Sequence, residues 1–239
     1  MINDYNKKIS DIKNNSHYNK TEKLEQLFQL WKEKHSSEDI LPKELINYQK
    51  KIINSLTIPY QFVDKESFTY DGFIFNENKD TVLYILKESN LGNTNKAKDQ
   101  FWFKSVYKLE KNTVLILKKI ELMQEFIIEK NKGAIKKSDI SFMNLNKRGG
   151  FTSTNPKILK NYYLKYQEFI KAEIEIIDPK IIVFCMSEKK SKDIQYIIND
   201  IKKEFDNKII ISTSHPSYIK GTIENFKKDY YEGILNKRR

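Results

Sequence analysis

The chain has 239 residues, with 43 Lys and Arg against 32 Asp and Glu, which gives a net charge of +11 at pH 7. That length suits one domain, or one domain with an added arm, and an aromatic content of 13% excludes a disordered basic tail. The longest apolar run covers residues 181–186, whereas a membrane-spanning helix needs ~20 residues. The first residues form no signal-peptide pattern, and the single cysteine excludes an intramolecular disulfide framework and an all-cysteine metal site. We therefore expect a cytoplasmic protein.

The excess of basic residues indicates a polyanionic partner, most often a nucleic acid. Only three of the basic residues are arginine, and the rest are lysine. A chain rich in Lys, Asn and Ile can also result from a biased coding sequence, with the lysines simply covering solvated helix faces. Charge alone therefore leaves both explanations open.

The first part of the chain, residues 1–65, is expected to form a helical arm. Thr21 is expected to cap its first clear helix. The apolar stripe of that helix has spacings of three and four and consists of Leu24, Leu27, Phe28 and Trp31. Pro42 suits the first turn of a second helix. Residues 68–75 resemble a hairpin around an Asp-Gly pair and begin an α/β domain over residues 66–239.

From residue 81 onward, short apolar runs alternate with helical patterns. The apolar runs are expected to be buried strands over residues 81–86, 140–145, 181–185 and 208–212. The helical patterns cover residues 114–129, 155–177, 187–205 and 222–235. This alternation predicts parallel strands joined by right-handed crossovers. We therefore expect a three-layer α/β/α domain with a central four-stranded, mainly parallel sheet.

Ligands of such sheets bind at the carboxyl ends of the strands, so the residues just after each strand are the candidates for function. No Gly-rich phosphate loop occurs at these positions, which argues against a nucleotide-hydrolysing or NAD-dependent enzyme. Glu88 supplies a carboxylate after the first strand, and Asn144 supplies an amide that could bind a base edge. His215, followed by Pro216 and Ser217, supplies a titratable donor after the last strand.

Each of these residues also has a plainer explanation. Glu88 and Asn90 could form an ordinary polar turn. Lys147 and Arg148, beside two glycines, suit a phosphodiester, but they also suit a solvated turn. A lone histidine such as His215 is usually structural.

Together, these strand ends resemble the uracil-DNA glycosylase superfamily. The resemblance covers residues 80–235 in the family's order and spacing and leaves the arm uncovered. Its most specific parts are residues 179–184, which follow a long helix, and residues 215–217. It implies the family's α/β fold and a monofunctional DNA N-glycosylase that acts as a monomer. It also implies DNA as the partner, no membrane, no metal and no organic cofactor.

The resemblance gives four residues specific roles. Glu88 falls where some branches have a glutamate, which could position or activate water, and Ser89 falls where other branches hold their water-activating Asp or Asn. Asn144 matches the asparagine that binds the flipped base. His215 matches the histidine that stabilises negative charge developing on the departing base, and a preorganised donor of this kind acts on the transition state. A base inside a duplex must be flipped into a pocket before such chemistry.

Further residues are expected to contact the base or the DNA. The other candidates for base binding are Asn90, Leu91, Phe101 and Phe103, although the aromatic trio over residues 101–103 could equally be core. The candidates for DNA binding are Lys87, Lys147, Arg148, Ser217, Tyr218, Ile219 and Lys220. Among these, Tyr218 and Ile219 lie where the family inserts a side chain into the emptied base stack.

Two departures from the family pattern shape the expected substrate. The first motif lacks its usual glycine–proline frame, and Leu91 stands where one large branch has a tyrosine that excludes thymine. We therefore hypothesise a pocket for a modified pyrimidine, such as glucosylated hydroxymethylcytosine, and a role in defence against phages. A housekeeping uracil-DNA glycosylase of base-excision repair is one alternative. A second alternative is a catalytically inactive nucleic-acid-binding member, because Ser89 replaces the usual Asp or Asn. A third alternative is a small-molecule hydrolase on the same sheet.

Overall fold

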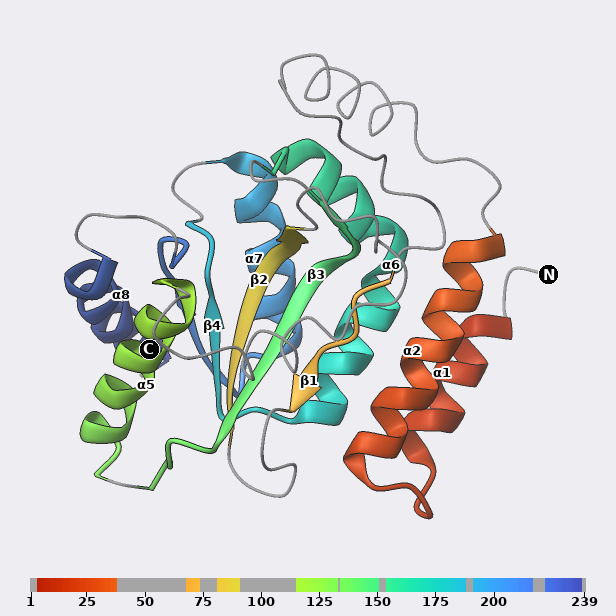
Figure 1. Ribbon diagram of the computed structural model, residues 1–239, viewed down its shortest axis with the longest axis horizontal. Coiled ribbons are helices and arrows are strands. Elements are labelled where there is room, and N and C mark those ends of the chain that lie inside the picture. The colour runs from red at the N-terminus through yellow and green to blue at the C-terminus, as the bar shows by residue number, and fades with distance from the viewer. Residues whose placement is uncertain are drawn as a thin grey trace.

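The computed structural model describes residues 4–37, 68–73, 81–90, 115–132, 134–150, 154–187, 191–216 and 222–237. Helices and strands alternate through most of this length (Figure 1). In chain order they are α1 (Asp4–Asn14), α2 (Lys20–Ser37), β1 (Gly72–Phe73), β2 (Val82–Asn90), α5 (Leu115–Lys130), β3 (Ile140–Gly150), α6 (Pro156–Ile177), β4 (Ile181–Phe184), α7 (Lys192–Glu204), β5 (Ile209–Ser212) and α8 (Thr222–Lys237).

The sheet has the strand order β1-β3-β2-β4-β5. Strands β3, β2, β4 and β5 run parallel to one another, which confirms the expected parallel arrangement of four strands, although the sheet has β1 as a fifth. The short strand β1 pairs antiparallel with the outer side of β3, with Gly72 opposite Phe142. The hairpin expected over residues 68–75 is therefore wrong for its described part, because β1 bonds to β3 rather than to the segment before it.

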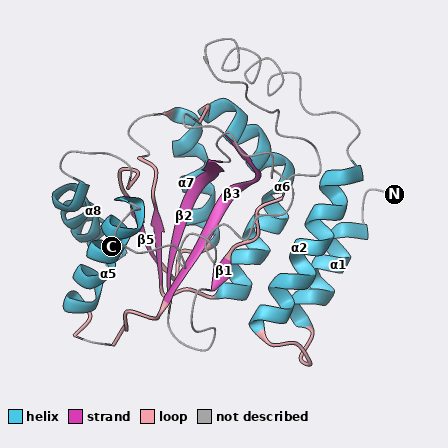
Figure 2. Cartoon of the chain, viewed as in Figure 1, coloured by secondary structure: helices cyan, strands magenta, loops and turns pink. Residues whose placement is uncertain are grey.

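Two hydrophobic clusters cover opposite faces of the sheet, as the alternation of side chains along a strand requires. Leu83 and Ile85 of β2 belong to the cluster beneath α2, α6 and α7. Val82 and Tyr84, their neighbours on the same strand, belong to the cluster beneath α5 and α8. The described helices thus lie on both sides of the sheet (Figure 2).

The described part of the arm packs against the α/β domain. Its expected apolar stripe is confirmed, since all four side chains are buried: Leu24, Leu27, Phe28 and Trp31. They share one hydrophobic cluster with α6 and with strands β2 and β3. The second expected helix, which starts at Pro42, lies outside the described residues.

The arm helix begins differently from the sequence-based expectation. Asn19, rather than Thr21, is its N-cap, because the Asn19 side chain accepts a hydrogen bond from the backbone N–H of Glu22 at 2.8 Å. Glu22 in turn accepts from the backbone N–H of Asn19, also at 2.8 Å. This reciprocal capping box pairs each residue's backbone N–H with the other's side chain, which a cap two residues later would not allow.

The other expected helices follow their sequence signals closely. Asn155 caps α6 by accepting from the backbone N–H groups of Lys157 and Ile158, with Pro156 in the first turn. Asp178 ends that helix in the left-handed conformation. Helix α7 starts later than expected, at Lys192, because Ser191 is its cap. No helix within the described ranges has the length and apolar character needed to cross a bilayer.

Close packing of α8 against β5 yields a stability prediction. A Cβ on Gly233 would lie 2.9 Å from the Ile210 carbonyl oxygen and 3.1 Å from Ile211 Cγ1. We expect Gly233→Ala to destabilise the fold by about 1–3 kcal/mol through overpacking, although alanine favours a helix by about 1 kcal/mol. Urea unfolding followed by circular dichroism measures this, and Asn225→Ala, at an exposed position of α8, is the matched control. A Gly233→Ala midpoint equal to or above that of the wild type would contradict the prediction.

Candidate functional site

The topology places a switch point at the carboxyl ends of β2 and β4. These strands are neighbours, but the crossover from β2 leads to β3 on one side, and the crossover from β4 leads to β5 on the other. Ligands of open α/β sheets bind at such a switch point. Lys87 and Glu88 lie at the end of β2, and Ser187 follows β4, so they flank this position. Because the strands run in one direction, their carboxyl ends meet at one edge (Figure 2).

Glu88 is joined at this edge by a residue that the sequence analysis did not select. Asn146 of β3 lies opposite Glu88 in the strand register. Its side-chain nitrogen Nδ2 donates to Glu88 Oε2 at 2.9 Å. Residues 146–150, expected to be a loop, are the last part of β3, and this extension brings the amide beside the carboxylate. The spacing Asn-Leu-Asn places both asparagines on one face of the strand, but only the register shows which one meets Glu88.

Asn144, the expected base-binding residue, lies deeper in the sheet. It pairs with Leu86 in the register and is fully buried. Its backbone N–H donates to Asp71 Oδ2 at 2.6 Å, and its Nδ2 donates to the same oxygen at 3.2 Å. The amide is thus held toward Asp71, and Asn146 lies nearer the carboxyl edge.

Lys147 and Arg148 do not reach the surface, which corrects their expected contact with DNA phosphates. Lys147 is completely buried, and its ammonium forms ion pairs with Asp71 and with Glu173, at 2.8 Å from Glu173 Oε2. Arg148 is 3% exposed and donates to the Tyr166 hydroxyl at 3.2 Å. Basic side chains at a glycine-rich strand end resemble a phosphate site in sequence, but here they anchor the strand to α6 and the edge of the sheet.

The ion-pair cluster also touches the arm. The Lys147 ammonium lies 5.1 Å from the centre of the Phe28 ring and 5.3 Å from that of Trp31, both on α2. The backbone N–H of Lys147 donates to the Tyr162 hydroxyl at 3.2 Å, and that hydroxyl is 2.7 Å from His35 Nε2. Burial lowers the pKa of His35 well below its usual range, assisted by the charge of Arg148, so its imidazole is neutral.

His215 lies on the β5 side of this switch point, just after β5. Burial lowers its pKa to about 4, and the charge of Lys87 at the end of β2 contributes. At neutral pH the imidazole is therefore uncharged, and it can donate one hydrogen bond without carrying a positive charge. Glu88 and His215 thus place a carboxylate and a neutral donor at the same edge of the sheet.

Several expected site residues lie outside the described part of the chain. They are Leu91, Phe101, Phe103, Ser217, Tyr218, Ile219 and Lys220. Ser89 and Asn90 belong to the end of β2, but their side chains are likewise not described. Their expected roles in catalysis, base binding and DNA binding stay predictions.

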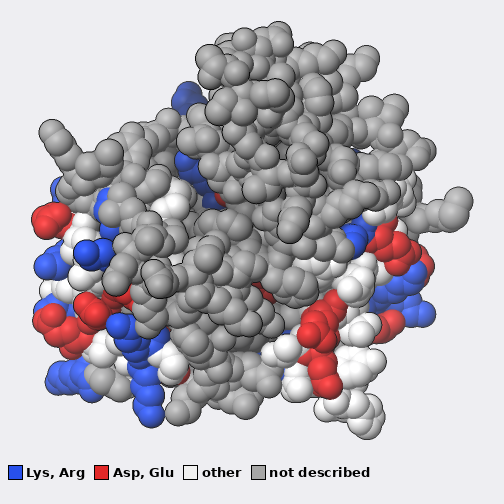
Figure 3. Space-filling view, in the orientation of Figure 1, with Lys and Arg blue, Asp and Glu red and all other residues white. Residues whose placement is uncertain are grey.

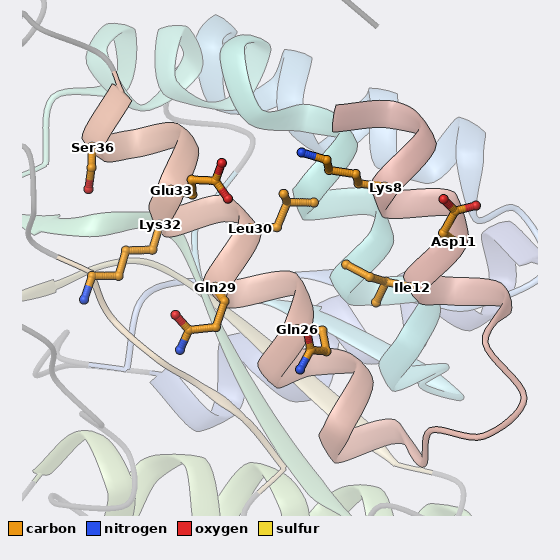
Figure 4. A pocket seen from close by; sticks show the side chains of 9 residues that line it. All are labelled: Lys8, Asp11, Ile12, Gln26, Gln29, Leu30, Lys32, Glu33 and Ser36. Carbon is orange, nitrogen blue, oxygen red and sulfur yellow. The ribbon is translucent and has the colours of Figure 1, made fainter. Parts of the chain in front are cut away.

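A groove of about 700 Å³ lies far from this edge, between α1 and α2. Figure 4 shows Ile12 and Leu30 among its lining side chains. The charges around it are balanced, because two lysines face two carboxylates: Lys8, Lys32, Asp11 and Glu33. The side chains that line this groove therefore suggest no reaction, in contrast to those at the strand ends. In the described ranges, no group of three His, Cys, Asp or Glu residues could hold a metal ion.

The described surface carries both signs of charge. On the face in Figure 3, blue and red side chains are interspersed on both flanks of the molecule. Ion pairs such as Lys8–Asp4, at 2.7 Å, account for some of this mixture. On this face, the net charge of +11 does not form one continuous basic patch within the described residues.

No protein-family model and no curated protein matches the chain. The described part of the site consists of a carboxylate held by an amide, a neutral imidazole and a lysine, all at the carboxyl edge of a parallel sheet.

Removing the buried ammonium of Lys147 should destabilise the folded protein. In Lys147→Met, the carboxyl groups of Asp71 and Glu173 would remain buried without their counter-charge, and we expect a loss of about 3–5 kcal/mol in the free energy of unfolding. Chemical denaturation measures this loss. Lys137→Met is the matched control, because the Lys137–Glu125 pair is 3.7 Å long and both side chains are 55% exposed. Similar small losses in the two variants would contradict the structural role of Lys147.

The lowered pKa of His215 predicts a specific pH dependence of stability. Its folded pKa of about 4 lies below the usual value of 6.5, so the folded state favours the neutral form. This contribution is fully present above pH 6.5 and is lost as the pH falls through 4. Between pH 7.5 and 4.5, we expect the wild type to lose about 1–3 kcal/mol more unfolding free energy than His215→Asn. Parallel stability profiles of the two proteins would exclude this partly buried neutral imidazole.

Proposed function

We propose that this protein is a monofunctional DNA N-glycosylase of the uracil-DNA glycosylase type. It would flip a modified pyrimidine out of DNA and hydrolyse its N-glycosidic bond, leaving an abasic site. The observation that supports this proposal most is that Glu88 and a neutral His215 both lie at the carboxyl edge of a doubly wound parallel sheet.

These two groups suit the two ends of an N-glycosidic bond. As the C1′–N bond breaks, the sugar develops oxocarbenium character and the base departs with negative charge. A carboxylate such as Glu88 can take a proton from the water that adds to C1′. The neutral His215 donates a hydrogen bond to the departing base, which later gains a proton from solvent. A neutral imidazole does this without giving up its proton.

The substrate proposal rests on the first strand end. Leu91 replaces the tyrosine that crowds the 5-position of the base in one branch of the family, so strict uracil specificity does not follow. A base with a substituent at that position, such as glucosylated hydroxymethylcytosine, is the proposed target. Such a base occurs in the DNA of some phages, so the enzyme would serve defence rather than routine repair.

Base release from defined DNA tests the proposal. The panel contains uracil, hydroxymethylcytosine, glucosylated hydroxymethylcytosine and unmodified cytosine, in single and double strands. Alkali cleavage reveals abasic sites. We expect release of the modified cytosine, with Glu88→Gln slower by about 10²–10⁴-fold and His215→Ala by about 10²–10³-fold. Glu25→Gln and His17→Ala, at exposed positions of the arm, are the matched controls.

The same panel separates the alternatives. Release of uracil alone would indicate a housekeeping uracil-DNA glycosylase. Binding without release from any DNA would indicate an inactive nucleic-acid-binding member, and its affinity should fall steeply with salt. Turnover of free nucleosides with little dependence on salt would indicate a small-molecule hydrolase.

A further inference from the structure

Asn146 contacts the carboxylate on which the proposed chemistry depends. The two residues are paired on adjacent parallel strands, and Asn146 Nδ2 lies 2.9 Å from Glu88 Oε2. Asn146 is only 2% exposed, so its amide is held inside the protein rather than presented freely to solvent. A buried donor at this distance restricts the orientation of the carboxylate.

The amide of Asn146 is itself fixed in one orientation. Its oxygen Oδ1 accepts a hydrogen bond from the backbone N–H of Arg148 at 3.0 Å. If the amide flipped, its NH₂ group would face that N–H, and two donors would oppose each other. The backbone therefore directs the NH₂ group toward Glu88. A hydrogen bond donated to a carboxylate favours the ionised form over the protonated form.

The backbone that holds this amide is firmly anchored. Lys147, between Asn146 and Arg148, is bound through its ammonium to Asp71 and Glu173. The carbonyl of Lys147 accepts from the backbone N–H of Thr69 at 2.7 Å. The end of β3 is thus held by the Lys147 ion pairs on the opposite face and by Thr69 at the neighbouring edge, which fixes the N–H of Arg148.

We propose that Asn146 is a positioning residue that keeps Glu88 ionised and in a single orientation for accepting a proton. This inference rests on the proposed role of Glu88 in base release. Asn146 acts through Glu88 and does not need to touch the substrate. It connects the buried ion-pair cluster to the reacting carboxylate.

Kinetics and pH profiles provide the first test. We expect Asn146→Ala to lower kcat by about 10- to 100-fold, with little change in KM, because the carboxylate loses its fixed position. The acidic limb of the pH–rate profile should move upward by about one unit, since the ionised form loses its donor. Asn146→Asp should move it further through repulsion between carboxylates. Asn199→Ala, at an exposed position of α7, is the control. An Asn146→Ala variant with an unchanged profile would overturn the proposal.

Carbon-13 NMR gives a second readout that does not depend on activity. The side-chain carboxyl of Glu88, assigned with Glu88→Gln, is titrated in the wild type and in Asn146→Ala. An upward shift of its pKa in the variant supports the inference even if no DNA releases a base, and that failure would then concern the proposed function alone. Equal pKa values in the two proteins would overturn the inference even if the enzyme is active.

Discussion

Three ionisable side chains meet in the interior of this protein, out of contact with water: Lys147, Asp71 and Glu173. Burial raises the pKa of Glu173 well above its usual range, with Lys147 opposing that effect and Asp71 adding to it. Burial thus opposes ionisation of Glu173, and the ammonium of Lys147 is the charge that counteracts this effect. An unbalanced charge at such a place would cost several kcal/mol, so all three groups must arrive together.

This requirement links three parts of the chain. Asp71 comes from the segment before β1, Lys147 from the end of β3 and Glu173 from α6, while rings of α2 lie beside the ammonium. The helical arm is thus packed around the cluster and is joined to the sheet by it. Burial removes two basic side chains, Lys147 and Arg148, from any surface that could face DNA. The carboxyl groups of Asp71 and Glu173 are buried with them, so the net charge of +11 is carried by the rest of the chain.

The cluster and the candidate site lie on opposite sides of one strand end. Because side chains alternate along a strand, anchoring Lys147 on one face orients Asn146 on the other, toward Glu88. On the other side of the switch point, His215 supplies the complementary hydrogen-bond donor. Burial keeps its imidazole neutral. The proposed chemistry thus depends on buried polar contacts more than on an open basic surface.

The local pattern of the sequence determined most of the secondary structure. The apolar runs predicted the four parallel strands, and Asn155-Pro156 and Asp178 marked the two ends of α6, because these signals act within a few residues. The same reasoning selected Glu88 and His215, since residues that follow strands of a parallel sheet must lie at one edge. Local patterns also gave errors, with Thr21 taken as a cap and the Asp-Gly pair taken as a hairpin.

Only the tertiary structure decided which residues that are far apart in the chain contact one another. Asp71 and Lys147 are 76 residues apart, and no local pattern shows that they form an ion pair. For that reason Lys147 and Arg148 were predicted at a DNA-facing surface but are buried. The choice between Asn144 and Asn146 depends on how β3 is aligned with β2, because a shift of two residues would place the other amide beside Glu88. Strand register is set by packing of the whole sheet, and the sequence of one strand does not contain it.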